Sequence, residues 1–229
     1  METLGTVYGG WSVPEHMSLN RGSVVYSGGV GEDISFDIKL QAKYDCNILL
    51  IDPTVKAIRH FDEVKQYYKQ DNFQFTGNIQ DDYVPHIQFE TPNMDKFEYV
   101  NMGLWDQKDT LKFYRQTNDK YVSQSLIPNM FGTTYDEVNV NSIKGMMNER
   151  CHSKIDLLKL DIEGAEIKVL NQMLDDCIFP KYVLVEFDLW LKRKDPSNET
   201  KNLVERFLRN HYEIVANDNC NITFVKTDI

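Results

Sequence analysis

The sequence predicts an α/β fold with a mostly parallel sheet, helices on both faces and an antiparallel hairpin at the C-terminal end. Short apolar runs and longer helical patterns follow one another along most of the chain, as parallel βαβ units require. The apolar runs are nearly continuous, which is typical of strands that are buried on both faces. Near the end, Tyr212–Val215 and Ile222–Val225 are two short strand patterns separated by turn residues, which indicates the hairpin.

The first elements alternate twice between strand and helix. Val24–Tyr26 is a short apolar strand, and Glu32–Ala42 then carries apolar residues into a helix. Asn47–Ile51 is an apolar run that ends at a carboxylate. Thr54–Lys69 follows as a helix, for which Thr54 is a candidate N-cap.

The middle of the chain has weaker patterns. We expect a short strand near His86–Phe89 and the third parallel strand at Phe97–Met102. The segment Thr110–Tyr114 together with Val122–Ile127 indicates a hairpin-like insertion, and Thr134–Val140 is another short strand pattern. These elements interrupt the strand and helix alternation without adding a second apolar core.

The last part returns to the alternation. The run IDLLKL is apolar except for Lys159 and predicts a buried strand, and Ala165, Val169 and Met173 then recur at four-residue steps on one face of a helix. The elements expected here are a helix at Ser142–Arg150, strands at Ile155–Leu160 and Tyr182–Phe187, and a helix at Glu199–Asn210.

Length and composition favour one domain over residues 1–229. The hydrophobic content is 41%, enough for a substantial core, and there is no internal repeat or Pro/Gly/Ser linker. We expect residues 1–23, which are rich in glycine, to form an irregular lid-like segment over an α/β core of residues 24–229.

Charge and cysteine content exclude several classes of protein. With 25 Lys and Arg against 35 Asp and Glu, the net charge of −10 makes nucleic acid an improbable partner. The four cysteines form no CxxC pair and predict neither a zinc site nor a disulfide framework. We see no secretory signal and no apolar run of membrane-spanning length, so we expect a soluble cytoplasmic protein without a membrane partner.

A glycine loop after the first predicted strand indicates a nucleoside cofactor. The step Gly29-Val30-Gly31 lets the backbone approach a ligand closely, but the third glycine of a GxGxxG motif is missing. Glu32 and Asp33 place two negative charges where a dinucleotide would place its diphosphate. They suit a cationic amino group instead, although acids at a helix start also stabilise the helix by themselves.

The acid that ends the next strand supports this interpretation. Asp52 lies 21 residues after Gly31, the reach expected of a carboxylate that accepts hydrogen bonds from ribose hydroxyls. S-adenosylmethionine (SAM) is a nucleoside with both an amino group and a positive sulfonium, so it fits. The predicted cofactor-binding residues are Ser27, Gly28, Gly29, Gly31, Glu32, Asp33 and Asp52, with Gly103 and Leu104 flanking the adenine unless Gly103 only makes a tight turn.

Four acids follow the fourth and fifth predicted parallel strands, at the edge where open α/β sheets bind ligands. Asp161, Glu163 and Glu186 are candidate catalytic residues, one of them as general base. Alternatively, Asp161, Glu186 and Asp188 bind Mg²⁺ or another hard cation. Two neighbouring charges have simpler interpretations. Glu163 can cap the following helix, and Glu166 is expected to be a solvated acid in its first turn.

Three other residues have roles that the sequence leaves between alternatives. Tyr8 and Trp11 either line the acceptor pocket or clamp the edge of the sheet. Lys159, in a strand that should be buried, either extends its ammonium group to solvent or makes an internal salt bridge.

Several long motifs, in this order, resemble those of the FkbM-type SAM-dependent methyltransferases. They are YGGWSVP, VYSGGVGEDISFD, LLIDPT, GLWDQKDTLKFY, LLKLDIEGAEIKVL and VLVEFD. The resemblance implies a class I SAM methyltransferase (Rossmann-like) sheet and O-methylation of a hydroxyl, often on a sugar or a natural product. Two departures are Gly28, where relatives commonly carry a larger residue, and the absence from VEFD of a histidine often found there.

The resulting hypothesis is a SAM-dependent O-methyltransferase that acts on a small-molecule or glycan acceptor. A sugar hydroxyl is the leading acceptor, for example of a deoxysugar such as rhamnose within a glycan, with Mg²⁺ or another divalent cation as a candidate second cofactor. The alternatives are an NAD-dependent oxidoreductase on a similar sheet and a non-catalytic interaction domain with the same fold.

Overall fold

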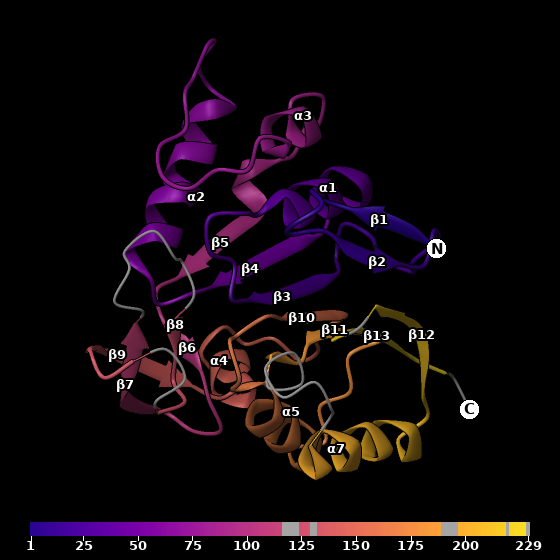
Figure 1. The fold of residues 1–229 in the computed structure, drawn as a ribbon. Coiled ribbons are helices and arrows are strands. Elements are labelled where there is room, and N and C mark those ends of the chain that lie inside the picture. The colour runs from indigo at the N-terminus through magenta and orange to yellow at the C-terminus, as the bar shows by residue number, and fades with distance from the viewer. Residues whose placement is uncertain (116–123, 129–131, 189–196, 219, 228–229) are drawn as a thin grey trace.

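A seven-stranded mixed sheet forms the centre of the computed structural model, which describes residues 1–115, 124–128, 132–188, 197–218 and 220–227 (Figure 1). The strand order is β12-β13-β11-β10-β3-β4-β5. Strands β11, β10, β3, β4 and β5 are parallel, and β13 is antiparallel to both β11 and β12. The bounds are β3 Val24–Gly28, β4 Asn47–Ile51, β5 Phe97–Val100, β10 Leu157–Leu160, β11 Tyr182–Glu186, β12 Tyr212–Asp218 and β13 Asn221–Lys226.

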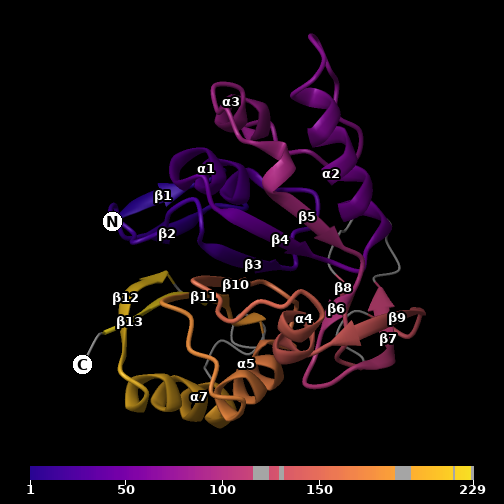
Figure 2. The same ribbon diagram turned by 180° about the vertical axis from the view of Figure 1, so that it is seen from behind.

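Helices cover both faces of this sheet, as Figures 1 and 2 show from opposite sides. On one face lie α1 (Ser35–Tyr44), α2 (Val55–Tyr67) and α3 (Tyr83–Ile87), and on the other α4 (Ile143–Glu149), α5 (Glu166–Asp175) and α7 (Asn198–Arg209). The fold class that the sequence predicts is therefore confirmed, including the antiparallel C-terminal hairpin.

Side-chain alternation along β4 explains why its apolar run is continuous. Ile48 and Leu50 belong to the hydrophobic cluster under α1 and α2, whereas Leu49 and Ile51 belong to the cluster under α4, α5 and α7. Each side chain is at most 3% exposed. Burial of an aliphatic side chain of this size stabilises the fold by roughly 1.5–3 kcal/mol, so both faces hold the strand in place.

The helix starts follow local rules. The Oγ1 of Thr54 accepts a hydrogen bond from the Ala57 N–H at 3.2 Å, which confirms the predicted N-cap of α2. Ser142 and Ser197 cap α4 and α7 in the same way. In contrast, α1 begins at Ser35 rather than at the predicted Glu32.

Two expectations about irregular regions were wrong. The segment near His86–Phe89 is not a strand, because Tyr83–Ile87 forms the short helix α3, which precedes the 3₁₀ turn Met94–Lys96. Residues 1–23 contain an antiparallel pair, β1 (Glu2–Leu4) and β2 (Trp11–Val13), which lies beside α1. Short strands of this kind carry too few residues for a period to show.

A separate four-stranded sheet has the order β6-β9-β7-β8 (Figure 1). Its strands are β6 (Gly103–Leu104), β7 (Asp109–Arg115), β8 (Gln124–Ser125) and β9 (Tyr135–Asn141). The expected insertion and the short strand after it are therefore neighbours, since β7 pairs with β9 along its whole length. Within the described ranges, no helix is both long and apolar enough to cross a membrane.

Candidate functional site

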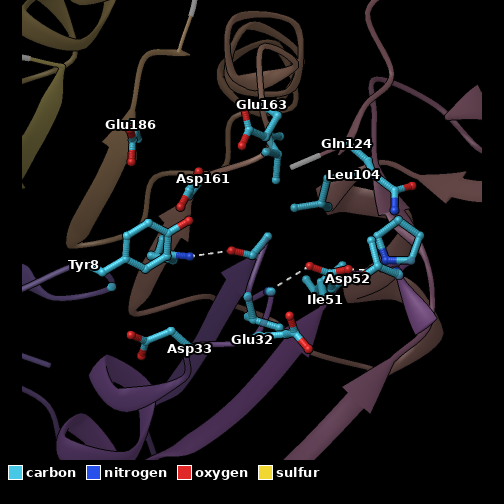
Figure 3. A pocket seen from close by; sticks show the side chains of 18 of the residues that line it. Tyr8, Glu32, Asp33, Ile51, Asp52, Leu104, Gln124, Asp161, Glu163 and Glu186 are labelled. Carbon is cyan, nitrogen blue, oxygen red and sulfur yellow. Dashed lines mark hydrogen bonds between the residues drawn. The ribbon is translucent and has the colours of Figure 1, made fainter. Parts of the chain in front are cut away.

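A cavity of about 270 Å³ opens at the carboxyl ends of β3, β4 and β10 (Figure 3). The chain leaves β3 in one direction to form β4 and β5 and later returns on its other side as β10 and β11. Parallel sheets bind ligands at such switch points, because the loops diverge there and leave a crevice. The cavity therefore lies where the sequence predicts the cofactor site.

Backbone crowding explains the glycine turn that forms one wall. Gly29 and Gly31 have positive φ angles of 70° and 53°. A Cβ at Gly29 would lie 1.6 Å from the Asp161 carbonyl oxygen, so no other residue fits. A Cβ at Gly28 would meet the Leu104 Cδ1 at 2.7 Å. Gly28 and the buried Ser27 do not line the cavity; they bring the turn close to its neighbours.

Asp52 links the glycine turn to the next loop. Its Oδ2 accepts the Gly31 N–H at 3.0 Å and its Oδ1 accepts the Thr54 N–H at 2.8 Å. The carboxylate is buried and lines the cavity. Because each carboxylate oxygen has two lone-pair directions, both oxygens keep one for a ligand hydroxyl.

Glu32 and Asp33 also line the cavity, but both already have partners. Glu32 forms an ion pair with the Arg59 guanidinium and accepts a hydrogen bond from the Asn78 N–H at 3.4 Å. Asp33 accepts the Thr6 hydroxyl at 2.6 Å and the Ser35 N–H at 2.9 Å, so it joins the N-terminal segment to the start of α1. We call Glu32, Asp33 and Asp52 the glycine-turn acids.

Lys159 also lines the cavity, close to the Gly29 carbonyl. It is 5% exposed and donates a hydrogen bond from Nζ to the Gly29 carbonyl at 2.7 Å. Its Nζ is also 5.9 Å from the centre of the Trp11 ring. Of the described residues that line the cavity, Lys159 alone is cationic. It therefore neither reaches bulk solvent nor makes a close ion pair within the described chain, and its charge faces a space that a ligand can enter.

A second group of acids follows β10 and β11, and we call it the strand-end acids: Asp161, Glu163, Glu186 and Asp188. The first three line the cavity, whereas Asp188 lies just behind Asp161 and Glu163. Carboxylate oxygens of Asp161, Glu163 and Asp188 lie within 4.8 Å of one another. Glu163 has a φ of 56°, which turns the chain sharply between β10 and α5.

Three of the strand-end acids, Asp161, Glu186 and Asp188, hold their protons more tightly than ordinary carboxyl groups. Burial raises the pKa of Asp161, although the Lys159 ammonium opposes this effect. Burial and then the Asp161 charge raise the pKa of Glu186 to about 7. For Asp188, burial and then its carboxylate neighbours raise the pKa to about 11. A cation or a hydrogen-bond donor on a ligand would stabilise the charged forms of these three acids.

Asp188 and Glu186 have few hydrogen-bond donors among the described residues. The Asp188 side chain is 5% exposed, and its Oδ2 has no partner among the described residues. Glu186 accepts a weak hydrogen bond from the Cys220 thiol at 3.6 Å. Asp188, a predicted cation ligand, is thus a buried side chain and not an exposed loop acid, because the end of β11 carries it inward.

Glu166 is the acid for which sequence reasoning failed most clearly. Expected in solvent, it is 1% exposed and accepts the Ile162 and Gly164 N–H groups, each at 3.0 Å. Burial raises its pKa to about 7. Its carboxylate therefore holds the turn that presents Asp161 and Glu163.

The two predicted acceptor residues both line the cavity, from different depths. Trp11 is 4% exposed within β2, whereas the Tyr8 ring is exposed at the rim. The Tyr8 hydroxyl points toward Asp161 in Figure 3. Its partial burial, followed by the Asp161 charge, raises the Tyr8 pKa to about 12.

The predicted Gly103 and Leu104 also line the cavity, together with residues that the sequence did not single out. Ile51, Leu104 and Phe113 give the wall beside Asp52 an apolar face, and amide side chains surround it. Phe113, Gln124 and Leu126 come from the four-stranded sheet or the turn after it, and no sequence signal places that sheet against β4. The amide-bearing lining residues are Asn78, Gln80, Gln124 and Asn221.

The fold and the cavity together define an α/β protein with a nucleoside-sized site at the switch point of a seven-stranded sheet. The FkbM methyltransferase domain model matches residues 82–214, more than half of the chain. The chain belongs to this family and is a SAM-dependent methyltransferase with a class I fold.

Two further comparisons concern curated proteins and solved structures. No curated protein matches this chain significantly. Of the solved structures, the fibrillarin pre-rRNA processing protein of Methanococcus jannaschii is similar over 92% of this chain and 68% of its own, with 11% identity and a TM-score of 0.44.

Proposed function

We propose that this methyltransferase transfers a methyl group to a hydroxyl oxygen, with a sugar hydroxyl as the leading acceptor. The observation that carries the proposal is that three of the strand-end acids, Asp161, Glu163 and Glu186, line the cavity. A hydroxyl is both a donor to such carboxylates and a group whose proton must leave during methyl transfer. A deoxysugar such as rhamnose within a glycan is the specific acceptor that we favour.

The residues around the glycine turn fit SAM in charge and shape. Asp52 keeps two lone pairs for the ribose hydroxyls, and Gly29 leaves no side chain in the way. Lys159 is the cation that can pair with the carboxylate of the amino-acid part. When bound, SAM supplies a methyl group on a positively charged sulfur. Glu32 and Asp33, already partnered, add negative potential toward its amino group.

The apolar wall suits the adenine ring. Gly103, Leu104 and Ile51 line the same cavity as the amides of Asn78 and Gln80. A flat heterocycle gains from apolar contact on its faces and from amide donors and acceptors at its edge.

The acceptor side has the chemistry of a general base. Glu186 has a pKa near 7, which is the range in which a carboxylate both takes a proton and exists in its basic form. Asp161 and Glu163 lie beside it and orient the hydroxyl by accepting hydrogen bonds. Tyr8 and Trp11 offer aromatic surface to a sugar ring at the same end of the cavity.

A methyl-transfer assay on a panel of sugars and small alcohols tests the proposal, with SAM as donor and product detected as S-adenosylhomocysteine (SAH). We expect turnover with at least one deoxysugar and none with matched amines or thiols. Turnover only with a nitrogen or sulfur acceptor would overturn the O-methyl assignment while keeping the family.

Thermal unfolding with added ligands tests the alternatives from the sequence. We expect SAH to raise the melting temperature and NAD to leave it unchanged, since Glu32 and Asp33 line the place of a diphosphate. Stabilisation by NAD alone would restore the oxidoreductase alternative. A non-catalytic domain would show neither SAH stabilisation nor any loss when Asp161 becomes Ala.

A further inference from the structure

A buried acid without a partner lies behind the acceptor end of the cavity. Asp188 lies two residues after the end of β11 and is only 5% exposed. Its Oδ2 has no hydrogen-bond partner within the described chain. An unpaired buried carboxylate is expensive, because it loses water and gains nothing in return. A structure that keeps one there needs a ligand for it.

Two more carboxylates converge on the same point. One oxygen from each of Asp161, Glu163 and Asp188 lies within 4.8 Å of the others. Two oxygens bound to one ion are separated by at most twice the metal–oxygen distance, about 4.2 Å for Mg²⁺ and about 5 Å for Ca²⁺. Separations of up to 4.8 Å are close to the Ca²⁺ limit, so side-chain rotations can bring the three oxygens around one ion.

The side chains next to this group have partners of their own. Lys159 directs its ammonium to the carbonyl of Gly29, and no ion pair joins it to Asp161 within the described residues. One carboxylate oxygen of Glu166 accepts two backbone N–H groups. Glu186 accepts from the Cys220 thiol. The oxygens that converge are those of Asp161, Glu163 and Asp188.

We propose that Asp161, Glu163 and Asp188 form a binding site for one hard divalent cation, with its open coordination positions toward the cavity. This set differs from the sequence prediction, in which Glu186 replaces Glu163. Glu186 is left free to act as the base. Cation binding itself does not depend on the proposed function. Its use in the reaction does, because a coordinated hydroxyl loses its proton more easily.

Calorimetric titration of the EDTA-treated full chain with CaCl₂ and with MgCl₂ tests the site. We expect one ion per chain, and at least tenfold weaker binding in Asp188→Asn and in Glu163→Gln. Asp71→Asn and Glu199→Gln, both at exposed positions, are the matched controls and should bind as the wild type does. Absence of binding for both ions, or unchanged affinity in Asp188→Asn, would overturn the proposal.

Thermal unfolding gives a second readout whose sign separates the site from a merely structural acid. We expect CaCl₂ to raise the melting temperature of the wild type but not of Asp188→Asn. In EDTA, we expect Asp188→Asn to be at least as stable as the wild type, because it removes an unpaired carboxyl group. A variant that melts earlier in EDTA and still gains stability from CaCl₂ would contradict the assignment.

SAH affinity on the same samples keeps the two proposals apart. Unchanged SAH binding with no cation binding would remove the metal site and leave the methyltransferase intact. Cation binding without SAH binding would do the reverse.

Discussion

Two groups of carboxylates face one cavity, and they differ in what holds them. Each glycine-turn acid has strong partners: Asp52 accepts two backbone N–H groups, Glu32 pairs with Arg59, and Asp33 accepts a hydroxyl and an N–H. Of the strand-end acids, Glu186 accepts a weak hydrogen bond from a thiol, and the Oδ2 of Asp188 has no partner among the described residues.

This difference distinguishes acids that are held in place to bind a ligand from acids that can exchange a proton. Partnered carboxylates cannot move or change protonation without breaking the loop that they hold, so they suit a cofactor that is bound and released unchanged in shape. Acids with raised pKa values exchange protons and accept cations readily. In the proposed function, the glycine-turn acids hold the nucleoside and the strand-end acids take part in the chemistry.

The largest expected effect comes from substitution of a strand-end acid. Asp161→Asn should lower the rate of methyl transfer by roughly 10²–10⁴-fold, the usual contribution of a group that orients or removes a reacting proton. SAH affinity, measured by calorimetry, should change less than threefold. A parallel loss of SAH affinity and rate would place Asp161 with the glycine-turn acids.

Among the glycine-turn acids, Asp52→Ala should affect folding as well as binding. It removes the acceptor of two backbone N–H groups, and hydrogen bonds to a charged group contribute about 1.5–3 kcal/mol each. We expect the free energy of unfolding in urea to fall by about 4 kcal/mol and SAH binding to be lost. Full stability with normal SAH affinity would show that the two groups of acids do not differ.

Another buried acid, Asp37 in α1, extends the comparison because it lies close enough to Asp33 and Lys159 to feel their charges. Asp37 is 2% exposed with no partner for Oδ1 in the described chain, and burial, opposed by Lys159, raises its pKa to about 6. The folded state therefore binds more protons than the unfolded state between pH 4 and 6. The free energy of unfolding must fall as the pH rises through this window, by at most about 3 kcal/mol.

Urea unfolding of the wild type and Asp37→Asn across pH 4–8 measures this contribution. The stability difference should move in favour of the variant up to pH 6 and then stay constant. A difference that is flat across the whole range would mean that Asp37 has a partner in solution.

The smallest expected effect comes from turning a partnered acid into an unpartnered one. Arg59→Met leaves Glu32 buried without its ion-pair partner, but Arg59 itself is 45% exposed, so solvent screens the pair. We expect a loss of about 1 kcal/mol in unfolding free energy, which Glu32→Gln in the same chain should restore. Failure of the second substitution to restore stability would show that Arg59 acts by packing rather than by charge.

The sequence was informative where one period or one chain position determines the outcome. The strand Asn47–Ile51 and the cap at Thr54 follow from apolar runs and local hydrogen bonding, and both are confirmed. The parallel sheet follows from their alternation with helices. Asp52 and Asp161 line the cavity because the carboxyl ends of neighbouring parallel strands meet at the same edge of the sheet.

Long-range pairing determined what the sequence left out. Nothing in the pattern of β7 shows that it pairs with β9 and brings Phe113 to the cavity wall. Glu166 is polar and in a first helical turn, yet backbone N–H groups from the preceding loop bury it. Whether an acid is partnered depends on groups distant in sequence, so the contrast between the two groups of acids is visible only in three dimensions.

The most direct test of the account is a crystal structure of the chain soaked with SAH. We expect the ribose hydroxyls on the Asp52 carboxylate, the amino-acid carboxylate within ion-pair distance of the Lys159 ammonium, and the sulfur facing the strand-end acids. A cavity that stays empty at saturating SAH, or that accepts a dinucleotide in its place, would contradict it.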